Sequence, residues 1–265
     1  MMLTMTNLYK TFNAGTVNEK RVLNGLSLDL REGDFVTVIG GNGAGKSTML
    51  NMIAGVHFPD QGNIKIDGEE VTSYPEYKRA KYLGRVFQDP MLGTAANMEI
   101  QENLALAYRR GRKRTLHWGI KRSERTLYEE RLKSLGLGLE TRMTSKVGLL
   151  SGGQRQALTL LMATLQQPKL LLLDEHTAAL DPKTAAKVLE LTEQMITAHS
   201  LTALMVTHNM KNAIQYGNRL IMMHDGVIIY DVSGEAKKNL KVSDLLEKFE
   251  SATGGELAND RMILS

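Results

Sequence analysis

Four glycines in nine positions, followed by a lysine and two hydroxyl residues, mark the stretch GGNGAGKST at residues 40–48. Glycine inside a regular element destabilises it by about 0.5–1 kcal/mol, so these glycines indicate a special backbone shape. Without Cβ atoms, backbone N–H groups can turn inward and approach phosphate oxygens. The stretch therefore predicts a nucleotide-phosphate site formed by Gly40, Gly41, Asn42, Gly43, Ala44, Gly45, Lys46, Ser47 and Thr48.

Two side chains of this loop have the chemistry that such a site needs. Lys46 supplies a positive charge for the β- and γ-phosphates, and the Ser47 hydroxyl is a ligand for Mg²⁺. The spacing Gly-x-x-x-x-Gly-Lys-Ser is that of a P-loop. The stretch follows the apolar run 35–39 and precedes a helix predicted over about 46–54, which is the context that a P-loop requires.

The stretch LSGGQ, at residues 150–154, predicts a second helix start that can bind an anion. This stretch places Ser151, Gly152, Gly153 and Gln154 ahead of a helix that we expect to run to about Gln167, before a proline. A serine hydroxyl and free backbone amides at a helix start can bind an anion. One nucleotide's γ-phosphate cannot usually be served by both helix starts of a single chain, so the second start needs an explanation.

Two carboxylates follow a strand that is predicted to be buried on both faces. The strand is the run of four leucines at 170–173, and Asp174 and Glu175 come directly after it. Ligands bind at the carboxyl edge of open α/β sheets. There Asp174 can hold Mg²⁺ through water, and Glu175 can polarise an attacking water.

Two further polar side chains stand at predicted strand ends. Gln88 closes a short strand predicted at 84–88, and His208 follows the buried strand predicted at 201–206. An imidazole at the carboxyl edge could donate to a γ-phosphate and hold the attacking water. A lone histidine is more often structural, and His176, directly after the acidic pair, is interpreted as a local hydrogen-bonding residue.

The remaining elements that must position these groups follow from hydrophobic periodicity and turn signals. Strands are expected at Leu3–Leu8 and Val22–Leu30, hairpins at 63–71 and 219–230, a helical region at 94–165, a helix at 184–199 and a polar C-terminal helix near 241–250. The α/β core is thus predicted to be interrupted by a helical insertion. The last dozen residues are expected to be loose.

Composition limits the class of protein. The chain has 265 residues, 42% of them hydrophobic, and no cysteine, which excludes disulfides and thiolate metal sites. It has neither an N-terminal apolar segment of signal-peptide length nor an apolar run long enough for a membrane helix, so any membrane role is expected to come through a partner.

The net charge of +4 is unevenly distributed. Basic residues cluster at Arg109, Arg110, Arg112, Lys113, Arg114, Lys121, Arg122 and Arg125, opposed by Glu124. This cluster can be a solvated loop and helix face, or it can meet an anionic membrane surface. RNA binding is disfavoured because only Trp118 interleaves the charges.

Together these motifs resemble the nucleotide-binding subunits of ABC transporters over roughly residues 2–235, and LSGGQ is highly specific for them. The resemblance implies an α/β fold: a P-loop NTPase core with a mixed or parallel sheet, an N-terminal antiparallel β subdomain and an inserted helical subdomain. It implies one ATPase domain over 1–240, with the helical subdomain at about 94–165, and a short C-terminal helix with a loose tail at 241–265.

The resemblance also assigns roles. ATP and Mg²⁺ are the implied cofactors. Glu175, His208 and Lys46 are implied to be catalytic, and Ser47, Gln88 and Asp174 to lie at the metal. Gln88 and Asp181 are also implied to be nucleotide-site residues, and Asp181, in the loop Ala179-Leu180-Asp181, is expected to cap the next helix. The base-stacking aromatic of the family corresponds best to Phe12, with Tyr9 as the alternative. ATP is implied to lie between the P-loop of one copy and the LSGGQ of another in a head-to-tail dimer, which accounts for two phosphate sites in one chain.

The whole-chain pattern is similar to a narrower group, the ATPases of bacterial importers that use a lipoprotein-type binding protein, often for tryptophan or tyrosine. It implies a membrane permease and a solute-binding protein as partners, no nucleic acid, and a location at the cytoplasmic face of the membrane. Two alternatives stay open: a soluble ABC ATPase, such as one for iron–sulfur cluster assembly, and the ATPase of an exporter.

Overall fold

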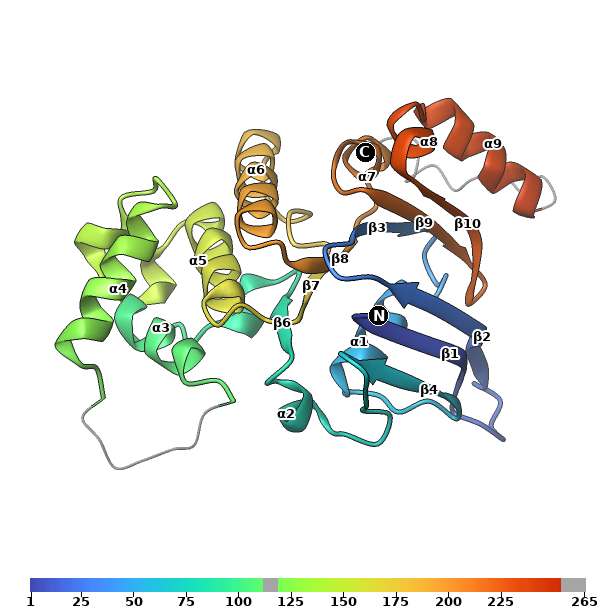
Figure 1. The fold of residues 1–265 in the computed structure, drawn as a ribbon, viewed down its shortest axis with the longest axis horizontal. Helices are drawn as coiled ribbons and strands as arrows, with labels where there is room; N and C mark the ends of the chain where they lie inside the picture. Colours follow the sequence, from blue (N-terminus) through green and yellow to red (C-terminus); the bar gives the residue numbers. More distant parts are fainter. Residues whose placement is uncertain (112–118, 254–265) are drawn as a thin grey trace. The chain divides into compact units, whose positions relative to one another are not determined.

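The computed structural model describes residues 1–111 and 119–253, and these form two compact units (Figure 1). The first unit comprises residues 1–79 and the chain from Ser200 onward, and the second comprises Ala80–His199. No helix within the described ranges combines the length and the apolar character that crossing a membrane requires. The predicted loose tail from residue 254, and Arg112, Lys113, Arg114 and Trp118 of the basic segment, lie outside the described residues.

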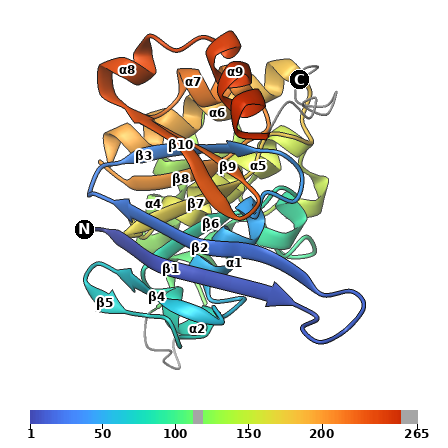
Figure 2. The same cartoon turned by 90° about the vertical axis from the view of Figure 1, so that its right-hand side faces the viewer.

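The first unit contains the predicted N-terminal antiparallel sheet, with strand order β2-β1-β4-β5 (Figure 2). Its strands are β1 (Leu3–Phe12), β2 (Lys20–Leu30), β4 (Gln61–Ile66) and β5 (Glu69–Glu70). The β4–β5 turn is made by Asp67 and Gly68, both with positive φ, as the Asp-Gly signal predicts. β1 extends four residues beyond the predicted strand, which places Phe12 at its end.

A second group of strands in this unit carries the glycine-rich loop. β3 (Phe35–Gly40) is buried along its whole length and pairs in parallel with β8 (Thr202–Val206) and β9 (Arg219–His224). β10 (Val227–Ser233) returns antiparallel to β9 around Asp225 and Gly226. The parallel pairs are the mixed-sheet core that the sequence predicted.

Five helices of the described residues complete the first unit: α1 (Lys46–Ala54), α2 (Glu76–Arg79), α7 (Met210–Gln215), α8 (Gly234–Lys238) and α9 (Val242–Thr253). α1 has the predicted bounds because glycines in the left-handed conformation stand at both ends. α2, α7 and α8 were not predicted, since each has six residues or fewer.

The predicted C-terminal helix is present as α9, but the prediction that it is polar was wrong. α9 is amphipathic, and its Leu245 and Phe249 are buried in a hydrophobic cluster with Ile39 and Met222. Ile39 lies in β3 directly before the glycine-rich loop, so α9 packs on the strand that carries this loop. The spacing of Leu245 and Phe249 by four residues places both on one helix face, which mean polarity does not reveal.

The second unit contains two parallel strands and a group of helices. The strands are β6 (Leu83–Val86) and β7 (Leu170–Asp174). The α-helices are α3 (Ile100–Tyr108), α4 (Arg122–Lys133), α5 (Gly152–Thr164) and α6 (Pro182–Ala198), with short 3-10 turns η1 (Pro90–Gly93), η2 (Leu139–Arg142) and η3 (Val147–Leu149). β6 ends earlier than predicted, so Gln88 lies two residues beyond the strand.

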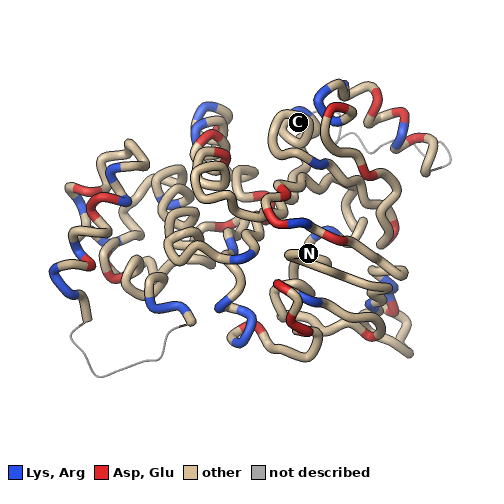
Figure 3. The backbone as a smooth tube through the Cα atoms, viewed as in Figure 1, with Lys and Arg blue, Asp and Glu red and all other residues tan. Residues whose placement is uncertain are grey.

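The described part of the basic segment is more mixed in charge than the sequence cluster indicates. Arg109 forms an ion pair with Glu124 at 2.8 Å, and Arg110 donates to the Ala163 carbonyl oxygen at 2.9 Å. Along α4, acidic residues are interspersed among the basic ones (Figure 3). Arg110 therefore supports packing within its unit and does not belong to a free basic face.

Candidate active site

The glycine-rich loop needs glycine for steric reasons. Gly40, Gly43 and Gly45 have φ of 156°, 85° and 97°. A Cβ at Gly40 would overlap the Met223 carbonyl oxygen, and one at Gly45 would lie 2.8 Å from Leu23 Cδ2. The loop is thus built from backbone conformations that other residues rarely adopt.

Helix α1 begins at this loop without a side-chain cap. Its N-cap is Gly45, and no side chain accepts from the first turn of the helix. Lys46 is 5% exposed, and its ammonium donates to the carbonyl oxygens of Gly40 at 2.7 Å and Gly41 at 3.0 Å. The Ser47 side chain is exposed. Uncapped amides beside a lysine fit an anion with several acceptor oxygens, such as a nucleotide phosphate.

In the first unit, the fold places His208 at the same sheet edge as this loop. β3 and β8 are parallel neighbours with Val38 opposite Val206, and Thr207 N donates to Val38 O at 3.0 Å. His208 therefore leaves its strand beside the position where the chain enters Gly40. Phe12 stands at the end of β1, half-buried, with its ring 5.2 Å from that of His57 in an edge-to-face arrangement.

In the second unit, Gln88 and the acidic pair lie at or just beyond the carboxyl ends of the paired strands β6 and β7. The parallel register sets Val86 opposite Leu173, so Gln88 and Glu175 each lie two residues beyond that pair. Asp174 is 3.7 Å from the guanidinium of Arg85, which also lies over the Phe87 ring at 4.6 Å. Arg85 is not among the residues predicted for the site, because a basic residue inside a short strand carries no motif.

The two residues after Asp174 differ sharply. Glu175 has a φ of 45°, a left-handed conformation that costs free energy outside glycine and often occurs at functional positions. His176 is buried, and burial lowers its pKa to about 4. Its Nε2 lies 3.1 Å from Thr192 Oγ1, whose own proton is donated to Val188 O at 2.8 Å. His176 Nε2 therefore donates, and the residue is a neutral structural histidine, as predicted.

Helix α5 begins with a complete capping box. Ser151 Oγ accepts from Gln154 N at 3.3 Å, and Gln154 Oε1 accepts from Ser151 N at 3.2 Å. Ser151 and Gly152 are exposed. One residue on, Arg155 donates to the carbonyl oxygens of Gly148 at 3.1 Å and Leu150 at 3.0 Å. Arg155 thus fixes the approach to Ser151, a role that local sequence could not reveal.

The start of α5 lies against the segment that precedes α6. A Cβ at Gly152 would lie 3.3 Å from Leu180 Cδ2, and one at Gly153 would overlap the Thr184 side chain. Asp181 caps α6 by accepting from Thr184 N at 3.1 Å, with a proline at the first helical position, as predicted. The fold therefore brings Ser151–Gly153 and Leu180–Asp181 together within this unit.

Comparison with known proteins identifies the family. Residues 23–178 match the sequence profile of the family described as ABC transporter. The chain is 47% identical to the tyrosine transport ATP-binding protein of Clostridioides difficile (strain R20291), over 95% of this chain and 100% of that protein. The chain belongs to the ABC transporter family. It is the ATP-binding subunit of a transporter, and it binds and hydrolyses ATP.

Solved structures agree with the fold of this ABC ATPase. The dimeric post-hydrolysis structure of the ATP-binding cassette MJ0796, bound to ADP and Pi, has a TM-score of 0.73 at 31% identity, and covers 88% of this chain and 98% of that one. The ADP conformation of the cassette MJ1267 has a TM-score of 0.76 at 27% identity, over 94% and 98% of the two chains. The predicted P-loop NTPase fold is confirmed.

The predicted Mg²⁺ ligands of the ABC ATPase have suitable chemistry. Ser47 offers a hydroxyl oxygen, Asp174 a half-buried carboxylate and Gln88 an amide oxygen. Mg²⁺ prefers such hard oxygen ligands and is usually bound through one or two carboxylates together with substrate phosphates. This donor set therefore fits a metal that arrives with a nucleotide.

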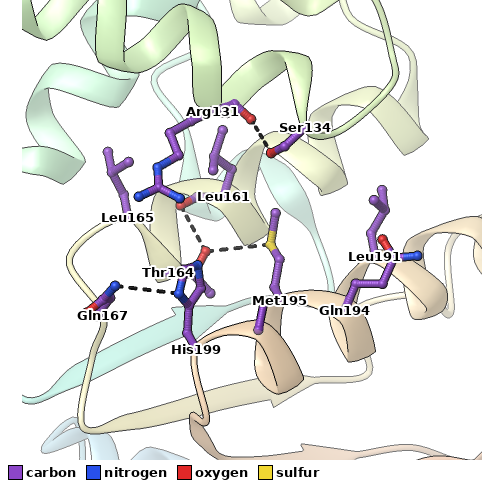
Figure 4. A pocket seen from close by; sticks show the side chains of 11 residues that line it. Arg131, Ser134, Leu161, Thr164, Leu165, Gln167, Leu191, Gln194, Met195 and His199 are labelled. Atoms are coloured by element: carbon purple, nitrogen blue, oxygen red, sulfur yellow. Dashed lines mark hydrogen bonds between the residues drawn. The ribbon is translucent and has the colours of Figure 1, made fainter.

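A cavity of about 250 Å³ lies elsewhere in the second unit, between the C-terminal parts of α4, α5 and α6 (Figure 4). Its lining includes the apolar side chains of Leu161 and Met195 and the polar side chains of Arg131 and His199. None of the predicted nucleotide residues lines it. The Thr164 hydroxyl bonds within the cavity wall, to Leu160 and Leu161 carbonyl oxygens at 2.9 and 3.2 Å.

Proposed function

We propose that this ABC ATPase works as a head-to-tail pair, in which each ATP lies between residues 40–48 of one copy and the Ser151 turn of the other. The observation that carries this is that the chain has two anion-type helix starts, an uncapped one at α1 and an exposed, self-capped one at α5. A related cassette of known structure is dimeric and bound to ADP and Pi, which supports the pairing. Each copy contributes one ATPase domain over residues 1–240, with a helical subdomain at about 94–165.

The phosphate end of this site does the chemistry. The backbone of the glycine-rich loop and Lys46 bind the β- and γ-phosphates. Glu175 polarises the attacking water, and His208 holds that water against the γ-phosphate. Mg²⁺, held by Ser47, Asp174 and Gln88, would neutralise charge on the phosphates. The left-handed backbone of Glu175 supports its assignment as the base, because strain of this kind is retained where function needs a fixed geometry.

The other parts of the site orient the nucleotide. Phe12 stacks on the base, and Ser151 to Gln154 of the partner copy close on the γ-phosphate through hydroxyl and amide donors. Asp181 couples the two copies through the segment that touches the α5 start. The close packing of Gly152 on Leu180 supports this coupling, since a movement of one segment displaces the other.

A membrane permease is the proposed partner, docked on exposed apolar side chains after Gln88. Met91 is 42% exposed, Leu92 71% and Leu149 70%, although all three are apolar. Arg155 links them, since it contacts Met91 Sδ at 2.9 Å and the carbonyls on both sides of Leu149. Met98, in the same segment, is half-buried.

The transported solute is proposed to be an aromatic amino acid, taken up with the help of a solute-binding protein, with this chain at the cytoplasmic face of the membrane. The support is the 47% identity to a protein named for tyrosine transport, over 95% of this chain. The test is tyrosine uptake in cells that lack the gene, complemented with the normal chain or with Glu175→Gln. Uptake restored by the normal chain alone would support import, whereas faster loss of preloaded tyrosine would indicate export.

The paired site has a direct test in Ser151→Arg. A bulky cation at the exposed α5 start should block closure on the second copy and abolish ATP hydrolysis. Nucleotide binding by the monomer should persist, because Ser151 lies outside the P-loop. Ser123→Arg, at an exposed position on α4, is the matched control and should keep normal turnover. Unchanged hydrolysis by Ser151→Arg would refute the paired site.

A further inference from the structure

The last residues of β1 extend beyond their partner strand. The β1–β4 ladder runs from Leu3 opposite Ile66 to Tyr9 opposite Gln61, and Gln61 is the first residue of β4. On the β4 side of β1, no strand residue therefore lies opposite Thr11. A backbone N–H in that position needs another acceptor or is left to water.

Asp60 supplies that acceptor. Its backbone N–H donates to Tyr9 O at 2.9 Å, and its Oδ2 accepts from Thr11 N at 2.6 Å. Its Oδ1 pairs with Lys10 Nζ at 2.7 Å. Partial burial alone would raise the pKa of Asp60, but the hydrogen bonds from Lys10 and Thr11 outweigh it and hold this pKa below its usual value. The carboxylate thus stays charged at neutral pH. It provides a hydrogen-bond acceptor for β1 just before the first residue of β4.

Phe12 directly follows Thr11, whose backbone N–H is bonded to Asp60. Its ring meets the His57 ring edge to face, with 5.2 Å between the centroids and 77° between the planes. Lys10 Nζ, already fixed by Asp60, lies 5.7 Å from the centroid of the same ring. The backbone before Phe12 and one side of its ring are therefore both held by residues 57–60.

Residues 57–60, which support Phe12, follow the end of helix α1 closely in the sequence. The backbone N–H groups of Val56 and His57 donate to Asn51 O, at 2.9 and 3.3 Å, and Gly55 ends the helix in a left-handed conformation. α1 has nine residues, so its axis is about 14 Å long. Its first residue is Lys46 of the phosphate loop, and its last turn leads within a few residues to the support of Phe12.

We infer that Asp60 and His57 are positioning residues for the aromatic ring that stacks on the nucleotide base, an inference that rests on the role proposed above for Phe12. One helix then anchors both ends of the nucleotide site: its start carries the phosphate loop, and the segment after its end fixes the base platform. Asp60 and His57 do not touch the nucleotide. They act by keeping the ring in the orientation that stacking requires.

The test separates base binding from phosphate binding. ATP hydrolysis is measured for Asp60→Ala and His57→Ala, together with competitive inhibition by inorganic tripolyphosphate, which has no base. Stacking of a base on an aromatic side chain is worth about 1–3 kcal/mol, so partial loss of its orientation should raise KM for ATP by roughly 3- to 10-fold. kcat and the tripolyphosphate inhibition constant should stay within about twofold of normal. Glu32→Ala, which removes an exposed carboxylate of the same unit, is the control and should change none of these values.

Phe12→Leu distinguishes a failure of the base-stacking role of Phe12 from a failure of the positioning role of Asp60 and His57. If Phe12→Leu leaves KM for ATP unchanged, the base-platform role itself is refuted. If Phe12→Leu raises KM but Asp60→Ala and His57→Ala do not, the platform stands and the positioning role is overturned. In the double variant Phe12→Leu/Asp60→Ala, KM should be no higher than in Phe12→Leu alone. An additive increase would mean that Asp60 acts elsewhere, which also overturns the inference.

Discussion

The two helix starts that resemble anion sites are built in opposite ways. At the start of α1, glycines stand in left-handed conformations, no side chain caps the helix, and Lys46 donates to backbone carbonyl oxygens of its own loop. At the start of α5, Ser151 and Gln154 cap one another fully, and Arg155 holds the preceding turn. The first start leaves its donors open for a ligand, whereas the second is satisfied within its own unit.

This difference bears on how the two starts would share one nucleotide in the proposed pair. An uncapped start gains most from bound phosphate, because the phosphate provides the acceptors that the helix lacks. A self-capped start is stable in isolation and can present a preformed surface to a second molecule. In the paired site proposed above, α1 therefore provides the primary ATP-binding contacts and α5 the closing contact.

The largest expected effect comes from placing the same substitution in both loops. Gly40→Ala should cost about 3 kcal/mol of unfolding free energy and abolish ATP binding, because its Cβ would overlap the rigid Met223 carbonyl and force a strained backbone. Gly152→Ala should cost less than about 1 kcal/mol, since only the Leu180 side chain must shift. Urea unfolding without nucleotide measures both. Equal costs would contradict the view that Gly40 is held by a rigid backbone contact that Gly152 lacks.

A slightly smaller effect is expected for stabilisation by ATP. The normal chain should gain about 2.7 kcal/mol at an ATP concentration one hundred times the dissociation constant. Lys46→Ala should lose nearly all of this gain, and Ser151→Ala should retain it, when unfolding is followed at protein concentrations too low for pairing. If Ser151→Ala also lost the gain, primary ATP binding would depend on the start of α5, which would contradict its assignment to α1.

A buried histidine of the second unit, His176, predicts that the free energy of unfolding depends on pH. Its folded pKa of about 4 is below the usual value of 6.5, so the unfolded chain binds the proton first as pH falls. The stability contribution is complete above pH 6.5 and is lost progressively towards pH 4. Between pH 7.5 and 5 the chain should lose about 2 kcal/mol from this residue. His176→Gln should flatten that part of the pH profile, and an unchanged slope would show that the imidazole titrates normally.

The smallest effect should come from the cap of α5. Ser151→Ala removes the acceptor for Gln154 N and should cost about 1 kcal/mol of unfolding free energy without nucleotide. Ser73→Ala, at an exposed position of the first unit, serves as the control. A cost no greater than that of the control would mean that the capping box is not formed in solution.

Features encoded by neighbouring residues were predictable. The bounds of α1 follow from Gly45 and Gly55, the cap of α6 from Asp181 and Pro182, and the two hairpins from their Asp-Gly turns. The candidate site residues could be proposed from the sequence for the same reason, since phosphate binding, capping and water activation use short motifs at strand and helix ends. The roles of these residues in catalysis stay predictions until the variants above are measured.

Features that depend on distant residues were missed. Nothing in the sequence around Asp60 indicates that it pairs with Thr11, 49 positions away. Arg79 is another such case: it is fully buried, and its guanidinium donates to the Met52 and Ile53 carbonyl oxygens at the end of α1. The buried face of α9 was missed because its apolar residues are few and only their spacing shows that they share a face.

The sequence by itself determined the local chemistry: which loops leave backbone amides open, which strand ends carry carboxylates, and which helix starts cap themselves. These depend on φ preferences and hydrogen bonds among residues close in the chain. The tertiary structure alone decided which distant groups hold those parts in place, as Asp60 holds the end of β1 and Arg155 the turn before Ser151. Such contacts arise only when the folded backbone brings separate segments within hydrogen-bonding distance, and no local preference encodes them.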